Sequence, residues 1–456
     1  MNARSLDSSA SIRPIDERRA LYRAFAASLS GTSLEYYDFA VYSAAAALLF
    51  AQLFFAPNDP LTGSLQAFAT FAVGYLARPL GGIVFGRLGD VIGRKRVLVI
   101  TLLVVGIATF LIGLLPTYAQ AGPIAPALLV SLRFAQGVGV GGEWGSAVWI
   151  TSELSQPGQR GFWASAAQIG PPIGTLLASG ILGLLSATLP EDALLSWGWR
   201  LAFLFSAVLV CFGLWIRSHL EETPVFRQLE ARGASPRAPV TEVLRDHRRA
   251  LAAAILSRIG PDVLYSLFAV FVLTYATHRL GLSRAQAVAA VLSGSALQVL
   301  LIPLSGWWSD RFGRKRIYAI GAVGAALWSA GFFALAHDFQ SVLIGVIGGL
   351  MFHSLMYGPQ AAFIAEQFPA RLRSTGSSLG YTLAGVVGGA IAPLVLTWLL
   401  SRQHGIQWMM LYICGACAIT LVGLVLGRAN DEHWPDAALR AAGINPLHDL
   451  RKQQSS

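Results

Sequence analysis

Twelve apolar runs, most of them about 20 residues long or longer, set the strongest limit on how this chain of 456 residues can fold. A helix that crosses a lipid bilayer needs about 20 mostly apolar residues. Lipid offers no hydrogen-bond partners, so the backbone amides must be satisfied within each run, which favours helices over an open sheet. The sequence therefore predicts an all-α integral membrane protein with twelve transmembrane helices, at residues 25–50, 65–88, 97–115, 124–150, 162–186, 199–217, 250–276, 285–308, 317–336, 341–366, 376–400 and 407–427.

The composition excludes the main alternatives to a membrane protein. Hydrophobic residues make up 54% of the chain and charged residues only 13%, whereas soluble proteins carry about 25% charged residues. So few charges cannot cover the outside of a water-soluble protein of this size. With three cysteines, the chain is not a disulfide scaffold either.

The net charge of +10 follows membrane topology and does not indicate nucleic-acid binding. Lysine and arginine cluster in alternate connections between the apolar runs, with 27 on one side and 4 on the other. Cytoplasmic connections carry such an excess, so both termini are predicted to lie in the cytoplasm. The five arginines among residues 1–24 do not resemble a signal peptide. We therefore expect a bacterial-type cytoplasmic membrane.

The two halves of the chain repeat each other. The segment Gly86-Arg-Leu-Gly-Asp90-Val-Ile-Gly93-Arg94-Lys-Arg96 follows the second run, and Gly306-Trp-Trp-Ser-Asp310-Arg-Phe-Gly313-Arg314-Lys-Arg316 follows the eighth, offset by 220 residues. Parallel six-helix halves of this kind build one large class of secondary transporters. We expect two pseudo-symmetric bundles, residues 25–217 and 250–427, with a tail at 1–24, a central loop at 218–249 and a tail at 428–456.

The repeated loop has the chemistry of a gate. Its glycines permit a tight turn, and its aspartate can accept hydrogen bonds from amides at a helix N-terminus. Its arginines can reach carboxylates at the ends of the fourth and tenth runs, each seven residues before an arginine. The alternative is a plain positive anchor. The predicted cytoplasmic gate comprises Gly86, Asp90, Gly93, Arg94, Glu153, Arg160, Asp310, Gly313, Arg314, Glu366 and Arg373.

Charged residues inside the apolar runs are the candidate transport site, because each is costly in a membrane unless paired or hydrated. Glu35 and Asp38 are spaced i, i+3, and Tyr42 continues their helix face. Two carboxylates so close cannot both ionise cheaply, and one of them could carry a proton. Arg258 and Asp262 are spaced i, i+4 and can pair directly.

The remaining candidates lie in the fourth and tenth runs. Arg133 and Glu143 are ten residues apart, too far to be partners, and His353 is offset by 220 from Arg133. Each candidate has a structural alternative: Glu143 as a hydrated surface carboxylate, His353 as a packing residue, and the pair in the seventh run as structural. Arg78, before Pro79, is interpreted as a structural anchor. The predicted proton-coupling residues are Asp38, Glu35, Glu143 and Asp262, and the predicted substrate-binding residues are Arg133, Arg258, Tyr42 and His353.

The two repeated loops resemble the signature of the major facilitator superfamily. Five further segments are Leu34-Glu-Tyr-Tyr-Asp-Phe39, Ala77-Arg-Pro-Leu-Gly-Gly82, Arg133-Phe-Ala-Gln-Gly-Val-Gly-Val-Gly-Gly-Glu-Trp-Gly145, Trp197-Gly-Trp-Arg200 and Glu221-Glu-Thr-Pro224. These segments resemble the metabolite:proton symporter family within that superfamily, and the region of the second to fourth helices is most similar to shikimate transporters.

We therefore expect a proton-coupled importer of a small organic anion, such as shikimate, an aromatic acid or a di- or tricarboxylate, working by alternating access. It should need no cofactor or metal and act as a monomer. Uptake of a zwitterion such as proline or betaine is the alternative. A different class, an intramembrane serine hydrolase, rests on Gly376-Ser-Ser378-Leu-Gly380 together with His353. That pattern has no strand before it and no identified acid partner.

Overall fold

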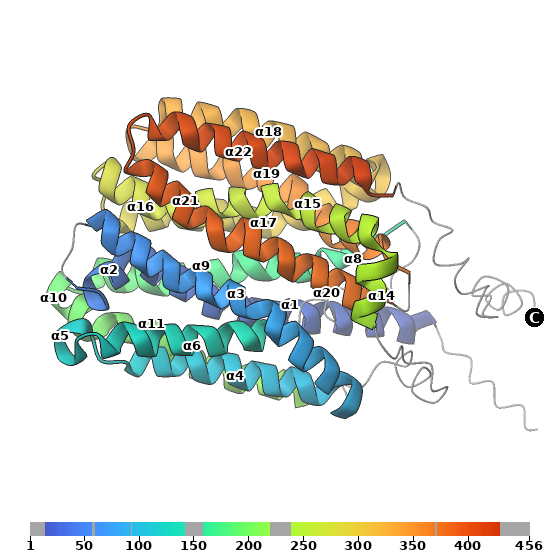
Figure 1. Cartoon of the computed structure of the whole chain (residues 1–456), viewed down its shortest axis with the longest axis horizontal. Helices are drawn as coiled ribbons and strands as arrows, with labels where there is room; N and C mark the ends of the chain where they lie inside the picture. Colours follow the sequence, from blue (N-terminus) through green and yellow to red (C-terminus); the bar gives the residue numbers. More distant parts are fainter. Residues whose placement is uncertain are drawn as a thin grey trace, which may run out of the picture.

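The computed structural model describes residues 14–56, 60–92, 94–141, 158–218, 239–369 and 372–428. Within these ranges the chain is helical apart from short turns, and none of the described residues is in a strand. The helices run side by side in one elongated bundle, and the start of the first helix and the end of the last lie at the same end of it (Figure 1). We call this end the Arg314 end, after a residue discussed below.

Six spanning segments make up the first part of the bundle. Short π-helical turns, labelled η, interrupt some of them. In chain order the elements are α1 Pro14–Ala45, η1 Ala46–Phe50, α2 Ala51–Leu53, α3 Pro60–Ile92, α4 Arg94–Leu114, α5 Tyr118–Ala121, α6 Ile124–Val140, α8 Arg160–Ala164, α9 Ala166–Thr188, α10 Glu191–Ala193, η2 Leu194–Gly198, α11 Trp199–Leu204 and α12 Ser206–Ser218.

Six more spanning segments follow a short helix, α14, which lies in the predicted central loop. In chain order the elements are α14 Pro239–Asp246, α15 Arg248–Tyr265, η3 Ser266–Phe271, α16 Val272–Thr274, η4 Tyr275–Arg279, α17 Arg284–Phe312, α18 Arg314–Leu335, α19 Phe339–Glu366, α20 Arg373–Ala384, η6 Gly385–Ala390, α21 Ile391–Leu400 and α22 Gly405–Leu426.

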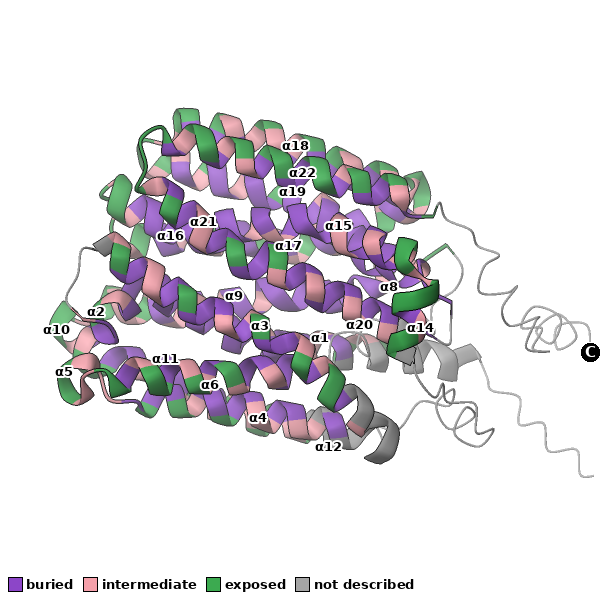
Figure 2. Ribbon diagram, viewed as in Figure 1, coloured by how far each residue is buried: buried purple, intermediate pink, exposed green. Residues whose placement is uncertain are grey.

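The predicted fold class is confirmed, since the described part of each of the twelve apolar runs falls on helical segments of the bundle. Within the described ranges, nine helices are long and apolar enough to cross a membrane, and two shorter apolar ones span Val99–Leu114 and Ile124–Val140. Buried positions concentrate on the helix faces inside the bundle, and large apolar side chains such as Leu327 and Val425 remain exposed on its outside (Figure 2). A bundle with an apolar exterior is suited to a lipid environment.

Glycines let the backbones of α3 and α6 touch. A Cβ atom at Gly137 would lie 2.1 Å from the carbonyl oxygen of Gly74, and one at Gly141 would lie 2.0 Å from that of Arg78. Neither position has room for a side chain, so the Gly-x-x-x-Gly spacing serves close helix packing here. This contact fixes the position of the α3 side chains along the bundle axis relative to those of α6.

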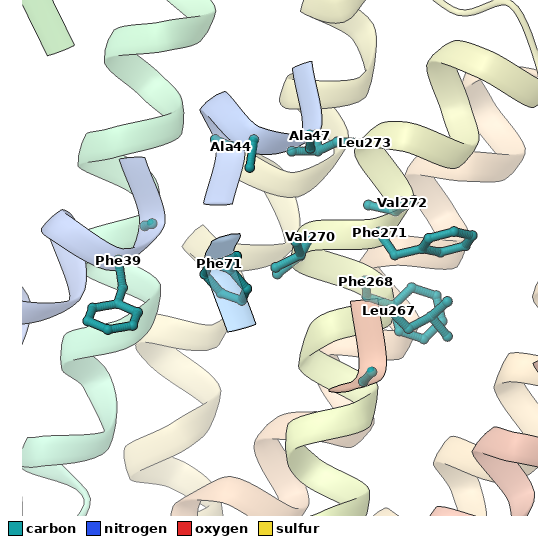
Figure 3. Packing of buried hydrophobic residues seen from close by; sticks show 14 of the residues in the cluster. Phe39, Ala44, Ala47, Phe71, Leu267, Phe268, Val270, Phe271, Val272 and Leu273 are labelled. Atoms are coloured by element: carbon teal, nitrogen blue, oxygen red, sulfur yellow. The ribbon is translucent and has the colours of Figure 1, made fainter. Parts of the chain in front are cut away.

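Other contacts join the first six spanning segments to the last six. Tyr75 on α3 packs against η6, where a Cβ atom at Gly389 would lie 2.8 Å from its ring. Near the opposite end of the bundle, Ala47 of η1 lies beside Leu273 of α16 in one apolar cluster (Figure 3). The two halves are therefore in contact in the middle of the bundle and towards that end.

An apolar groove of about 390 Å³ lies between α18 and α19, lined by Leu327, Trp328, Phe332 and Ile344 among others. It opens on the outside of the bundle and contains none of the predicted site residues. The charged centre described next is a separate feature.

Candidate functional site

Asp38 and Arg133 lie together in the middle of the first half, although they are on different helices. The Asp38 carboxyl, on α1, is within hydrogen-bonding reach of Thr109 on α4. It is also close enough to Arg133 on α6 for electrostatic attraction. Gln136 connects the group: it accepts a hydrogen bond from Arg133, and its Nε2 donates to Thr109 Oγ1 at 2.8 Å. Glu35 is also buried, one turn before Asp38 on α1. The predicted proton carrier and the predicted anion ligand are thus neighbours.

Arg133 is completely buried, and aromatic rings surround its guanidinium. The guanidinium carbon is 4.1 Å from the ring centre of Phe39, 4.2 Å from that of Tyr42 and 4.9 Å from that of Phe71. Its Nε and Nη2 atoms are buried without a hydrogen-bond partner among the described residues. A buried guanidinium is costly unless its donors are satisfied, and two donors of this one are left unsatisfied by the described residues.

The space for Arg133 depends on Gly74. A Cβ atom at Gly74 would lie 2.6 Å from Arg133 Nε, closer than any real contact. The hydroxyl of Tyr42 is held by Thr70 at 2.5 Å, which fixes one ring of the enclosure. The sequence proposed Tyr42 as a ligand from its place on the α1 face, and the structure puts it beside Arg133.

A second buried guanidinium, Arg78, lies beside the first. Its central carbon is 4.2 Å from the ring centre of Phe39 and 4.0 Å from that of Tyr75. Its Nε atom is also buried without a partner in the described part of the chain. We interpreted Arg78 from the sequence as a structural anchor beside Pro79. The structure puts it near Arg133, facing two rings, and its interpretation as an anchor stays untested.

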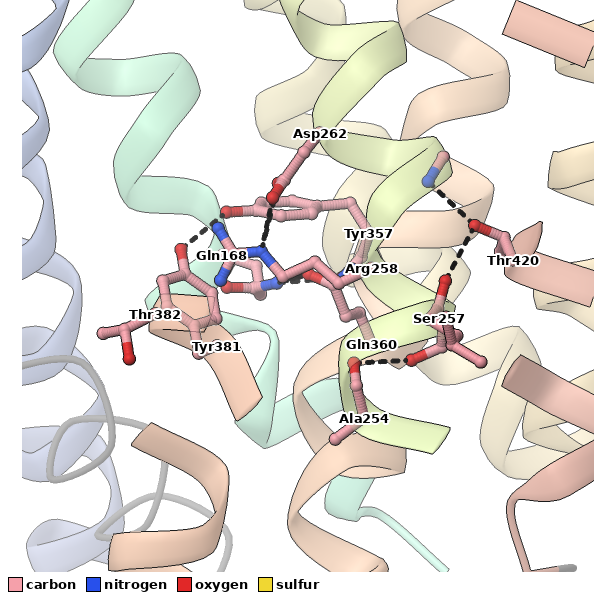
Figure 4. A network of polar contacts seen from close by, with 12 residues as sticks. Gln168, Ala254, Ser257, Arg258, Asp262, Tyr357, Gln360, Tyr381, Thr382 and Thr420 are labelled. Atoms are coloured by element: carbon pink, nitrogen blue, oxygen red, sulfur yellow. Dashed lines mark hydrogen bonds and ion pairs between the residues drawn. The ribbon is translucent and has the colours of Figure 1, made fainter. Parts of the chain in front are cut away.

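The second half supplies the predicted pair of Arg258 and Asp262 on α15. Arg258 Nε donates to both carboxylate oxygens of Asp262, at 3.1 and 2.9 Å (Figure 4). The Arg258 side chain is buried and that of Asp262 is 10% exposed. Gly388 of η6 packs against Asp262, since a Cβ atom there would lie 2.7 Å from that of the aspartate. The i, i+4 spacing alone was enough to predict this contact.

Tyrosines surround this pair and reach across to the first half. The Arg258 guanidinium lies 3.0 Å from the ring centre of Tyr381. The Tyr381 hydroxyl is hydrogen-bonded to that of Tyr36 on α1 and lies 3.5 Å from that of Tyr357 on α19. The charged centres of the two halves therefore meet through aromatic side chains.

His353 is part of a separate polar network. Its Nδ1 lies 2.7 Å from Gln298 Nε2, and its ring packs on Tyr265 and Tyr357. Tyr265 in turn shares a hydrogen bond of 2.6 Å with Thr175 on α9, which belongs to the first half. His353 thus lines the junction of the halves, and its predicted role in substrate binding stays a prediction.

At the Arg314 end, Asp310 holds the two halves together. Its two carboxylate oxygens accept hydrogen bonds from the backbone amides of Gly161 at 2.8 Å and Phe162 at 3.0 Å, at the start of α8. A carboxylate is favoured there by the exposed amides and the positive end of a helix. The two chains approach closely, because a Cβ atom at Gly161 would lie 2.5 Å from the Gly306 carbonyl oxygen.

Arg314 connects Asp310 to the tenth spanning segment. It lies 2.9 Å from Asp310 and 2.7 Å from Glu366, whose oxygens also accept from its Nε at 2.8 Å. The sequence anticipated both the carboxylate at a helix N-terminus and the reach of the arginine to Glu366. At the opposite end the halves are joined by an exposed pair, Arg284 and Glu191, at 3.0 Å.

Several predicted residues cannot be compared with the structure. Gly93, Glu143 and Glu153 lie outside the described residues. Gly86 and Asp90 near the end of α3, Arg94 at the start of α4 and Arg373 at the start of α20 are placed in helices, and nothing is described of their side chains. Arg160 begins α8, and Gly313 has a φ of 94° at the turn before α18, where glycine is favoured.

The serine pattern has no hydrolase geometry. Ser378 lies within α20, where its carbonyl oxygen accepts from Thr382. The nucleophile of a Gly-x-Ser-x-Gly motif stands on a sharp turn between a strand and a helix. Residues 372–384 are helical throughout.

Two six-helix halves with charged groups buried inside them have the architecture of a secondary membrane transporter. Comparison with family profiles agrees: that of the Major Facilitator Superfamily matches residues 262–455, and that described as Sugar (and other) transporter matches residues 23–238. The chain belongs to the major facilitator superfamily, as the repeated loops predicted, and its relatives are metabolite transporters.

Among these relatives is the shikimate transporter of Escherichia coli (strain K12), 38% identical over 427 residues, which cover 91% of this chain and 97% of the relative. The inner membrane metabolite transport protein YhjE of the same organism is 36% identical over 431 residues, 93% of this chain and 97% of the relative. The proline/betaine transporter of Salmonella typhimurium is 32% identical, over 90% of this chain and 84% of the relative.

The fold is similar to that of solved transporters. The partially occluded, inward-open structure of the xylose transporter XylE from E. coli superposes with a TM-score of 0.68 over 89% of this chain and 97% of that chain, at 17% sequence identity. An inward-open structure of the same transporter has a TM-score of 0.68 at 18% identity, over 92% and 99% of the two chains.

Proposed function

We propose that this protein imports a small organic anion together with a proton. The observation that carries the proposal is the position of Arg133: a completely buried guanidinium with two unpartnered nitrogen atoms, in range of the Asp38 carboxyl. The substrate carboxylate supplies the missing hydrogen-bond acceptors, and the proton binds to Asp38. No cofactor takes part, since the proton gradient drives the cycle.

The two ligands help each other to bind. While Asp38 is ionised, it attracts the Arg133 guanidinium and competes with the substrate carboxylate for it. A proton on Asp38 removes that competition and leaves Arg133 free for the anion. The reciprocal effect follows by linkage: the anion, by engaging Arg133, makes the proton easier to add. Coupling thus arises from one shared guanidinium.

Alternating access then depends on the contacts at the two ends of the bundle. Asp310 and the start of α8 hold the Arg314 end closed, and Arg284 with Glu191 joins the opposite end. Loading of proton and anion shifts the balance only through a difference in their affinity for the two orientations. We assign the Arg314 end to the cytoplasm of a bacterial inner membrane, because most lysines and arginines flank it.

The alternative substrate is a zwitterion such as betaine, which is considered because proline/betaine transporters are among the relatives. Its carboxylate suits Arg133 equally well. Its quaternary ammonium needs an aromatic face or a carboxylate of its own. In this structure guanidinium groups occupy the faces of Phe39, Tyr75 and Tyr381. This arrangement favours an anion.

The test is uptake into proteoliposomes of labelled shikimate, aromatic acids, dicarboxylates, citrate and glycine betaine, each with and without an inward proton gradient. We expect at least one organic anion to accumulate only with the gradient. The Asp38→Asn variant should lose accumulation yet still exchange labelled for unlabelled substrate across the membrane. Asp338→Asn, an exposed helix cap on α19, is the matched control and should behave as wild type.

Accumulation that is insensitive to a protonophore and to an imposed pH gradient would contradict proton coupling. Full accumulation by Asp38→Asn would contradict the assignment of the carrier. Uptake of glycine betaine alone would replace the anion by the zwitterion.

A further inference from the structure

Arg78 is a buried cation that the transport cycle described above leaves unused. Its side chain is about as buried as that of Arg258, yet its Nε has no hydrogen-bond partner in the described part of the chain. Its contacts there are the rings of Phe39 and Tyr75. Cation–π contacts return only part of the cost of removing a guanidinium from water. A structural anchor would be expected to have its donors satisfied.

The position of Arg78 is between the charged centres of the two halves. Phe39 contacts both Arg78 and Arg133. The guanidinium carbon of Arg78 lies 4.2 Å from the centre of its ring and that of Arg133 lies 4.1 Å from it, so the two cations are close to each other. On its other side, Arg78 is within Coulombic range of Asp262, in the second half. Its second ring, Tyr75, packs on η6 of that half.

The surroundings hold Arg78 in place. The α3 backbone at Arg78 is pressed against α6, because Gly141 leaves no space for a side chain there. Tyr75 lies one turn earlier on the same helix and is wedged against Gly389. These contacts fix the α3 backbone at Arg78, and its Nε is left without a partner among the described residues.

We propose that Arg78 is a substrate-binding and specificity-determining residue, which with Arg133 binds the substrate carboxylate beside Phe39. This inference rests on the proposed function, since it needs a substrate with a carboxylate, and it adds a second ligand to the same site. Two guanidiniums on one carboxylate select for full negative charge and reject a neutral ester or amide of the same acid. The ring of Phe39, which both guanidiniums contact, packs on the apolar body of the substrate.

The experiment compares Arg78→Gln and Arg78→Lys in the uptake assay, with the substrate that the wild-type protein transports best. We expect Arg78→Gln to raise KM at least tenfold, and Arg78→Lys, which keeps the charge, to restore part of the loss. The amide of the same acid should inhibit wild-type uptake poorly. With the Arg78→Gln protein, the acid should inhibit uptake only slightly better than its amide does.

Arg200→Gln is the matched control. Arg200 also lies on an aromatic ring, that of Trp199 at 4.7 Å, but its hydrogen bonds go to the carbonyl oxygens of Gly113 and Leu115 at the edge of the bundle. Its loss should leave KM unchanged. Size-exclusion profiles and melting temperatures in detergent separate folding from binding. For a variant that does not fold, Arg78→Lys supplies the comparison.

The outcomes are distinct. If the folded Arg78→Gln protein keeps the wild-type KM and the wild-type preference for acid over amide, the proposal is wrong and Arg78 is an anchor. Equal effects of Arg200→Gln would also overturn it. If the wild-type protein transports only betaine, the proposed function fails, whereas Arg78 is still tested by its effect on the KM for betaine, which also carries a carboxylate.

Discussion

Replacing Asp310 by asparagine should open the Arg314 end of the transporter. In the closed arrangement its two oxygens accept from the amides of Gly161 and Phe162, which belong to the other half. Asparagine keeps one acceptor and no charge. A hydrogen bond to a charged group contributes about 1.5–3 kcal/mol, so the variant should lose about 2 kcal/mol of the closed state. Because the bond between Arg314 and Glu366 lies within one half, it remains in both orientations and does not offset this loss.

A loss of about 2 kcal/mol shifts the equilibrium between orientations roughly 30-fold, given about 1.4 kcal/mol for each factor of ten. The measurement is a distance distribution between spin labels at Gln159 and Phe312, which are exposed at this end on opposite halves. The three native cysteines are first replaced. We expect a longer distance to become a major population in Asp310→Asn.

The control is Arg284→Gln at the opposite end. That pair is exposed, with Glu191 more than half accessible, and exposed ion pairs contribute about 0–1 kcal/mol. Its removal should leave the distribution close to wild type. An Asp310→Asn distribution indistinguishable from wild type, or an equal shift in the control, would refute the assignment of Asp310 as the contact that closes this end.

Three further predictions concern the centre of the bundle. Gly74→Ala places a methyl group 2.6 Å from Arg133 Nε, so it should raise KM severalfold with little change in melting temperature; an unchanged KM would contradict the packing. Arg133→Lys keeps the charge but loses the planar donors, and should weaken substrate binding roughly tenfold or more, measured by isothermal titration in detergent. Arg258→Gln leaves Asp262 buried and unpaired and should destabilise the protein by about 3–5 kcal/mol. Adding Asp262→Asn should recover much of that stability in thermal melts without restoring transport, and a double variant as unstable as the single one would argue against direct pairing.

Local spacing determined which parts of the site the sequence could predict. Arg258 and Asp262 are one helical turn apart, and helix geometry alone brings such residues into contact. The reach of Arg314 to Glu366 followed from the repeated loop, since two copies at a single offset constrain the topology at that end. The twelve helices followed from the length and apolarity of their segments, which are also local properties.

Contacts between helices were beyond that reasoning. The sequence paired Asp38 with Glu35, its neighbour on the same helix face, and could not place Thr109 and Arg133, on two other helices, near the Asp38 carboxyl. Arg78 was interpreted as an anchor because it precedes a proline, and the rings that face it come from α1 and from its own helix. Its one available signal was its burial in an apolar run without a nearby acid.

The approach of Gly161 to Gly306 also has a practical consequence. At this point hydrogen atoms alone separate two main chains from opposite halves, so the closed orientation leaves no tolerance for added volume. A single methyl group on either glycine should prevent closure of the Arg314 end without contacting the transport site. Such a variant would offer a stable, one-sided form of the protein for binding studies or for raising conformation-specific antibodies.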